Sequence, residues 1–224
     1  MNNIHIAIDG PAGAGKGTVA KELAEKLNLT YLDTGAMYRC VACAAKMAGV
    51  KSYDNDSLGK ILDDIDITFA DSGKKVFLNG EDVTEKIRTR EVDDLVGGVS
   101  GNKFVRERLV AMQRKYAEGN DIVMEGRDIG TVVLKDSPYK FYLDASVDER
   151  AKRRYEQNIK NNIECTLEAV KADIIRRDER DMNREADPLT RTEDALYIDS
   201  SDLTVDEVCD VIIAHIGKIK RGEK

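Results

Sequence analysis

The stretch Gly10-Pro11-Ala12-Gly13-Ala14-Gly15-Lys16-Gly17-Thr18 decides the fold of this chain. An apolar run over 4–8 precedes it and a helical pattern over 19–27 follows it. A strand, a glycine-rich loop, a lysine and a helix together cradle a nucleoside phosphate, because loop N–H groups and the helix N-terminus attract the anion. Lys16 adds a mobile positive charge, and Thr18 can place a hydroxyl near Mg²⁺. The alternative is a glycine-rich turn without a ligand.

The residue after Lys16 separates two classes of phosphate-loop protein. It is Gly17 rather than serine or threonine, and the hydroxyl comes one position later at Thr18. This Gly-Lys-Gly-Thr ending resembles the nucleoside monophosphate kinases more than the GTPases. The loop therefore favours phosphoryl transfer to a small molecule.

Composition limits the partners of the chain. Its 224 residues suffice for one α/β core with inserts. The net charge of −7 argues against non-specific nucleic-acid binding, so we expect no nucleic-acid partner. No apolar run approaches the roughly 20 residues of a membrane span, and the first residues lead into a strand rather than a signal peptide. We expect a cytoplasmic protein without a membrane partner.

The cysteines and histidines do not predict a metal site. The cysteines are Cys40, Cys43, Cys165 and Cys209. The first two have the C-x-x-C spacing of zinc and redox sites, but they lie in an alanine-rich helical run with no histidine nearby. We predict buried thiols, and structural roles for His5 and His215.

Strand patterns alternate with helical patterns along most of the chain. The expected strands are 4–8, 29–32, 122–124, 141–143 and 197–199. The expected helices are 19–27, 35–48, 58–62, 104–116, 147–159, 167–182 and a last one opened by Ser201 or Thr204. Such alternation indicates a parallel sheet with helices on both faces. We predict an α/β fold with a three-layer P-loop core.

A short antiparallel element interrupts this pattern. Residues 65–69 and 75–78 alternate, 71–73 joins them, and Asn79-Gly80 forms a second tight turn. We interpret the stretch between about 53 and 89 as an insert on the parallel core. No repeat, low-complexity tract or proline-rich linker divides the chain, so we expect one domain with appendages that move.

Two polar motifs follow expected strands. Asp33-Thr34-Gly35-Ala36-Met37-Tyr38-Arg39 begins with a capping-type residue, and Arg39 is placed to meet an anion at the carboxyl edge of the sheet. A capped helix with a surface arginine explains that motif equally well. Glu125-Gly126-Arg127-Asp128-Ile129-Gly130-Thr131 follows the strand over 122–124, and Glu125 is placed near Mg²⁺ or its waters. Its alternative is a solvated turn.

Arginines are dense toward the C-terminal end of the chain. Arg177, Arg180 and Arg184 recur at three- and four-residue spacing, which predicts that they share one helical face. Arginine clamps a transferring phosphoryl group, so we interpret this segment as a lid over the nucleotides. A solvated helix face is the alternative, because acidic residues are also abundant here.

Taken together, these motifs resemble those of the bacterial cytidylate kinases. The phosphate loop, the motif over 32–39, the motif over 126–133 and the run Arg177-Asp178-Glu179-Arg180-Asp181-Met182-Asn183-Arg184 fit that family in order. The resemblance implies transfer of the γ-phosphoryl group of ATP to CMP or dCMP, with Mg²⁺. It also implies one domain over 1–224, which we expect to be a monomer. Its expected parts are a core (about 1–36, 104–152 and 188–224), a nucleoside-monophosphate-binding insert (about 37–103) and a helical lid (about 153–187).

The resemblance also implies residue roles. Residues Gly10 to Thr18 would hold the phosphates of ATP, with Thr18 and a water-linked Glu125 near Mg²⁺. Arg106 and Asp128 would face cytosine, since a carboxylate accepts from its amino group while a guanidinium donates to the ring. The expected substrate-binding residues are Thr34, Arg39, Arg106, Arg127, Asp128, Arg177, Asp181 and Arg184, and the expected catalytic residues are Lys16, Arg127, Arg177 and Arg184.

One position departs from the family pattern, and other functions stay open. The family often has a serine near the base pocket where this chain has Gly97, which predicts weaker discrimination against UMP. A kinase for UMP or shikimate is one alternative, and a structural nucleotide-binding module is another. A GTPase-like switch would need an Asn-Lys-x-Asp pattern, whereas Asn102-Lys103 continues as Phe104-Val105.

Overall fold

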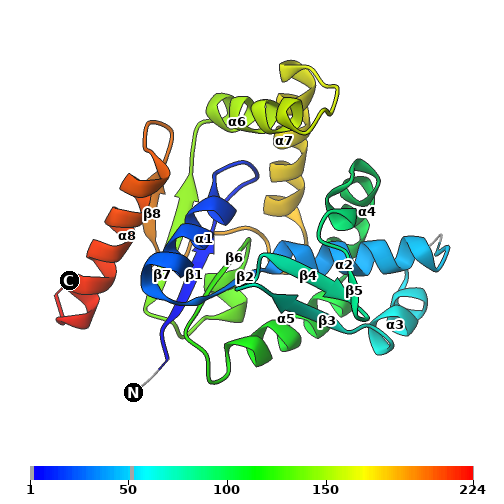
Figure 1. Ribbon diagram of the computed structural model, residues 1–224, viewed down its shortest axis with the longest axis horizontal. Helices are drawn as coiled ribbons and strands as arrows, with labels where there is room; N and C mark the ends of the chain where they lie inside the picture. The colour runs from blue at the N-terminus through cyan, green and yellow to red at the C-terminus, as the bar shows by residue number, and fades with distance from the viewer. Residues whose placement is uncertain (1–2, 51–52, 224) are drawn as a thin grey trace.

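The computed structural model describes residues 3–50 and 53–223. Five strands form one parallel sheet in the order β2-β6-β1-β7-β8 (Figure 1). They are β1 (His5–Asp9), β2 (Thr30–Asp33), β6 (Ile122–Gly126), β7 (Tyr139–Asp144) and β8 (Leu196–Asp199). The central strand β1 pairs with β6 and β7 and ends directly before the glycine-rich loop. The predicted parallel α/β core is confirmed.

Helices cover both faces of this sheet. Ile6 and Ile8 of β1 pack in one apolar cluster with α1 (Lys16–Leu27) and α8 (Val205–Lys220). The intervening Ala7 points to the opposite face and packs in a second cluster with α2 (Thr34–Met47) and α5 (Lys103–Ala117). Successive side chains of a strand alternate between faces, so one buried strand supplies both clusters and the core has three layers.

The predicted antiparallel insert is a three-stranded sheet. It contains β3 (Ile67–Ala70), β4 (Lys75–Leu78) and β5 (Glu81–Asp82) in that order. Asn79 and Gly80 both have positive φ, 50° and 82°, as a tight hairpin turn requires. The turn at 71–73 packs against β2, where a Cβ on Gly73 would lie 2.0 Å from the carbonyl oxygen of Tyr31. The insert is thus attached to the core at that turn.

One predicted helix begins earlier than expected, and several other elements were not predicted. Helix α3 (Asn55–Asp63) begins earlier than expected, because the Asp54 side chain caps it by accepting the Ser57 N–H at 2.8 Å. Helix α4 (Arg90–Gly101), the 3₁₀ turn η1 (Lys86–Arg88) and the π-helical turn η2 (Ile129–Val133) were also missed. Helix α4 buries Val92, Val96 and Val99, a helical spacing that the adjacent pair Gly97-Gly98 obscures in the sequence.

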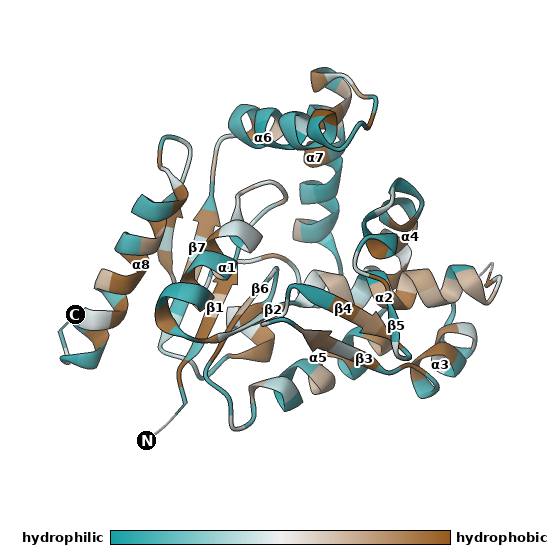
Figure 2. Cartoon of the chain, in the orientation of Figure 1, coloured by the Kyte–Doolittle hydropathy of each residue, from teal (hydrophilic) through white to brown (hydrophobic). Residues whose placement is uncertain are grey.

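Helices α6 (Val147–Lys160) and α7 (Leu167–Asn183) form a hairpin over the carboxyl edge of the sheet (Figure 1). Both are mainly hydrophilic (Figure 2), and only Ala151, Val170 and Ile174 form a buried cluster of their own. Helix α7 ends at Asn183, and Arg184 follows it with an extended backbone. The prediction that Arg184 shares a helical face with two other arginines is therefore wrong, because the helix ends before it.

The predictions for the cysteines, the histidines and membrane spans can be compared with the structure. Cys40, Cys43 and Cys209 are buried free thiols, as predicted, whereas Cys165 is half-buried. Both histidines make structural contacts: the His5 ring bonds the Ala117 carbonyl and His215 packs edge-on against Phe141. No helix within residues 3–50 and 53–223 is long and apolar enough to cross a membrane. Positions 1, 2, 51, 52 and 224 of the expected core and insert lie outside the described residues.

Candidate active site

One large cavity, of about 1510 Å³, opens at the carboxyl edge of the sheet beneath the α6–α7 hairpin. It brings together nearly all the predicted site residues, namely 12–18, Thr34, Arg39, Arg106, Glu125, Arg127, Asp128, Arg177, Asp181 and Arg184. Gly10 and Pro11 do not line it. Gly10 instead lies against β7, where a Cβ would sit 1.9 Å from the carbonyl oxygen of Leu143. That close approach explains the glycine at the end of β1.

Two positive charges of the cavity, those of Lys16 and Arg177, have no ion pair among the residues that the structure describes. Lys16 is buried and its Nζ donates to the carbonyl oxygen of Pro11 at 2.8 Å. Burial and the nearby Arg127 lower the pKa of Lys16 to about 7. Burial, Arg127 and Arg39 lower the pKa of Arg177 to about 10, and its buried Nε finds no acceptor among the described residues. Such a cluster is costly when empty and suits a ligand with several negative charges.

Two acidic residues, Asp9 at the end of β1 and Glu125 near the end of β6, lie next to the phosphate loop. Asp9 accepts the backbone N–H groups of Ile129 and Gly130 at 2.8 and 2.7 Å, and burial raises its pKa to about 6. It thereby holds the turn that carries Arg127 and Asp128. Burial is the main cause that raises the pKa of Glu125, and the negative charge of Asp33 raises it further.

Arg106 and Asp128 form a buried ion pair that lines the cavity. The Arg106 side chain is 1% exposed, and its Nε also donates to Asp187 at 2.8 Å. Arg184 approaches the other oxygen of Asp128 at 3.4 Å and donates from Nε to the Asp187 carbonyl at 2.7 Å. Residues 184–187 are thus tied to the Arg106–Asp128 pair, and a carboxylate with guanidinium groups lines the cavity, where a planar polar ring could be recognised.

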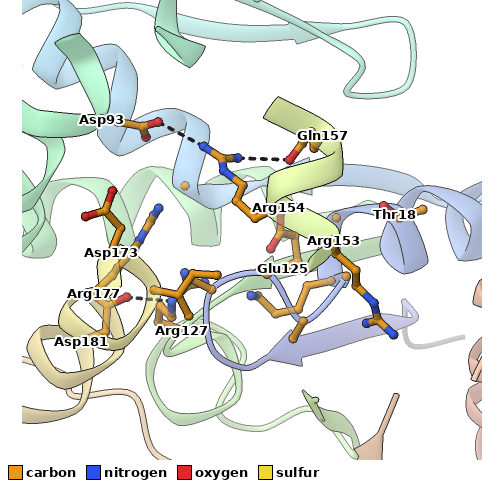
Figure 3. Close-up of a pocket in the computed structure, with 18 of the residues that line it drawn as sticks. Thr18, Asp93, Glu125, Arg127, Arg153, Arg154, Gln157, Asp173, Arg177 and Asp181 are labelled. Atoms are coloured by element: carbon orange, nitrogen blue, oxygen red, sulfur yellow. Dashed lines mark hydrogen bonds and ion pairs between the residues drawn. The ribbon is translucent and has the colours of Figure 1, made fainter. Parts of the chain in front are cut away.

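Ion pairs with carboxylates of α4 and α7 hold Arg39, Arg127 and Arg154. Arg127 donates from Nε to Asp181 at 2.9 Å, an interaction visible in Figure 3. Asp93 of α4 pairs with Arg39 and, at 3.4 Å, with Arg154 of α6 (Figure 3). These two carboxylates are paired with three arginines that could instead bind a phosphate.

The sequence model of the cytidylate kinases matches residues 6–218 of this chain. The chain belongs to the cytidylate kinase family. Among its relatives, the cytidylate kinase of Halalkalibacterium halodurans is 47% identical over 218 residues, which cover 96% of this chain and 98% of that one. The cytidylate kinase of Bacillus subtilis is 46% identical over 220 residues, with 97% and 98% covered.

Solved structures agree with the fold. An uncharacterised protein from Eubacterium ventriosum aligns with a TM-score of 0.55 at 17% identity, covering 96% of this chain and 99% of that one. At this identity the likeness concerns the arrangement of strands and helices. It supports the three-layer core described above.

For a member of the cytidylate kinase family, the donor set suits a nucleotide-borne Mg²⁺. No group of three or more histidine, cysteine or acidic side chains among the described residues could hold a metal ion alone. Thr18 and Glu125 both line the cavity near the phosphate loop (Figure 3). Mg²⁺ commonly takes one or two protein oxygens together with substrate phosphates and water, so the two residues fit that ion.

The sequence reasoning missed several residues of this cytidylate kinase site. Asp9 could have been noticed as a polar residue that ends an apolar strand. Asp93 gave no signal, because α4 was not predicted. Arg150 and Asp178 appeared only as members of charged helices, although the structure buries both against the phosphate loop.

Proposed function

We propose that this protein transfers the γ-phosphoryl group of ATP to CMP or dCMP, giving ADP and CDP or dCDP. One observation carries the proposal: the same cavity is lined by the phosphate loop, by the Arg106–Asp128 pair and by Arg39, Arg127 and other arginines. Membership of the cytidylate kinase family supports the same reaction.

Each end of the cavity has the chemistry for one nucleotide. The phosphate loop and Lys16 bind the ATP phosphates, and residues 200–205 beyond the loop leave room for its nucleoside. At the other end, Asp128 accepts from the cytosine amino group while Arg106 donates to the ring. Uracil reverses the donor and acceptor at that edge and leaves buried groups unpaired.

Catalysis rests on positioning and charge neutralisation. The transferred phosphoryl group passes through a loose transition state that needs no strong general base. Arg39 and Arg127 bind the acceptor phosphate with Arg184 in support, and Arg177 approaches from α7. The α6–α7 hairpin excludes water, which would otherwise accept the phosphoryl group. Thr18, and Glu125 through a water, would hold Mg²⁺, which would supply neutralisation of phosphate charge when the nucleotide is bound.

A coupled assay of ADP release with CMP, dCMP, UMP, AMP and shikimate tests this function. We expect turnover with CMP and dCMP, and kcat/KM at least about tenfold lower with UMP, as mismatched hydrogen bonding requires. Preference for UMP or shikimate would reassign the acceptor, and binding without turnover would favour a switch or a structural module. The expected monomer, the cytoplasmic location and the absence of a nucleic-acid partner stay predictions.

A further inference from the structure

The phosphate loop is held at one residue by the hairpin above it. The Ala12 N–H donates to Oδ1 of Asp178 at 3.0 Å, although these residues are 166 positions apart. The Ala12 carbonyl accepts from Nη1 of Arg150 at 2.9 Å. Arg150 and Asp178 are ion-paired with each other. Both polar backbone groups of one loop residue are thus bound by one ion pair, with its arginine on α6 and its carboxylate on α7.

This ion pair is a built feature and not a surface contact. The two residues are only 5% and 6% exposed, and Arg150 donates a further bond from Nε to the Ala145 carbonyl at 2.9 Å. Gly13 lies directly against the start of α6, where a Cβ would be 3.1 Å from Cβ of Arg150. Buried charges are retained where their geometry is satisfied on several sides, as it is here.

Asp178 also lies on α7 next to residues that line the cavity. The preceding residue, Arg177, and Asp181 one turn later both line the cavity, and Asp181 holds Arg127. Because a helix is rigid over one turn, the hydrogen bond between Asp178 and Ala12 also fixes the position of Arg177 relative to the phosphate loop.

We propose that Asp178, supported by Arg150, is a positioning residue that couples the shape of the phosphate loop to the docking of α7. When α7 is in place, Ala12 is oriented and the loop presents its N–H groups to the ATP phosphates. When α7 moves away, Ala12 loses its acceptor and the loop is free to reorient. The inference rests on the proposed function, and it predicts a larger effect on ATP binding than on CMP binding.

The test compares Asp178→Asn with Glu179→Gln, a matched carboxylate-to-amide change at the next, exposed position of the same helix. With Asp178→Asn we expect KM for ATP to rise and kcat to fall, each about tenfold, as small misplacements at reacting groups can cause. KM for CMP should rise less than KM for ATP, because the hydrogen bonds and the ion pair of Asp178 join it to Ala12 and Arg150 and it reaches the acceptor site only through α7. Glu179→Gln should leave all three values unchanged.

A second measurement needs no turnover. In the full-length protein without nucleotide, hydrogen exchange of a peptide spanning 10–15 should be faster in Asp178→Asn than in wild type or Glu179→Gln. Arg150→Lys, which keeps the charge but loses the fork of donors, should also speed this exchange, and it provides the test if Asp178→Asn does not fold. Isothermal titration with the ATP analogue AMP-PNP should show the matching loss of affinity.

The outcomes separate this inference from the function on which it rests. A wild-type protein that binds AMP-PNP but does not phosphorylate CMP would overturn the function, while the exchange and binding data would still test the loop. Unchanged exchange over 10–15 in both variants, or equal increases in KM for ATP and CMP, would overturn the positioning role and leave Asp178 as an anchor of the hairpin.

Discussion

Lys16 is the residue whose charge the proposed chemistry needs most directly. Lys16→Met should reduce kcat at least about a hundredfold, as loss of a charge clamp on phosphate typically does. The fold should survive, because the Nζ group makes its hydrogen bond to a neighbouring loop carbonyl, that of Pro11. Steady-state kinetics and a thermal melt measure the two effects. A variant that kept more than a tenth of the wild-type kcat would contradict the assigned role.

Asp128 should read the base of the acceptor. In Asp128→Asn the amide can donate where the carboxylate accepted, so the preference for CMP over UMP should fall at least about tenfold in kcat/KM. KM for ATP should stay within about twofold, because the side-chain contacts of Asp128 are with Arg106 and Arg184 and not with the phosphate loop. Equal losses for both nucleotides, or an unfolded protein, would remove Asp128 from base recognition. Asp210→Asn, on the exposed side of α8, is the control.

Single residues were predictable where they follow a strand directly. Arg127 comes directly after β6, and Arg39 lies in the helix that begins after β2; parallel strands bring such positions to one edge. Arg150 and Asp178 were not predictable in their role, because they meet Ala12 from 138 and 166 positions away. On a charged helix, nothing in the sequence separates a buried ion pair from a solvated one.

The α6–α7 hairpin is the element most suited to move. Its own apolar cluster is small, and ion pairs such as Arg127–Asp181 and Arg154–Asp93 connect it to the rest of the molecule. Hydrogen exchange over residues 154–187 should be faster than in β1 and β6 without nucleotide, and should slow when a bisubstrate analogue supplies phosphates to the arginines. Equal protection with and without the analogue would exclude a lid role for this hairpin.

Helix α4 offers a second test at the scale of elements. A Cβ on Gly97 would lie 2.3 Å from Nη1 of Arg180, so Gly97→Ser must displace that half-exposed side chain. The resemblance to the family places a serine here, and we expect Gly97→Ser to raise the CMP-to-UMP ratio of kcat/KM about threefold or more. Gly101→Ser is the matched control, because its Cβ would meet no atom within 4 Å. A similar rise in both variants would trace the effect to helix stability.

Element types were predictable where the apolar period was long and clean. The five core strands and helices α1, α2, α5, α6, α7 and α8 all coincide with predicted segments, with ends that shift by a few residues. Helix α4 and strand β5 were missed for different reasons. A glycine pair interrupts the first, and the second is only two residues long, too short to show a period.

On the scale of the whole molecule, apolar packing holds the core and the insert together, whereas polar contacts attach the α6–α7 hairpin to them. Two large apolar clusters join the sheet, its covering helices and the insert, whereas the α6–α7 hairpin has a third, isolated cluster. Local opening of the hairpin therefore exposes little apolar surface and leaves the core folded. The sequence suggested this division through the charge of 147–182, but the ion pairs that close it depend on tertiary placement.

The attachment of the insert at Gly73 has a consequence for protein engineering. Of the two turns in the small sheet, the one at 71–73 touches the backbone of Tyr31, whereas a Cβ on Gly80 would meet nothing within 4 Å. A short Gly-Ser linker or peptide tag inserted after Gly80 should leave expression and melting temperature nearly unchanged, since free loop tips accept insertions. The same linker after Gly73 should lower the melting temperature by several degrees, because it wedges the turn away from β2. The Asn79-Gly80 turn is therefore the site of this sheet at which a peptide can be inserted. Equal melting temperatures after insertion at both sites would mean that the contact with Tyr31 contributes nothing to stability.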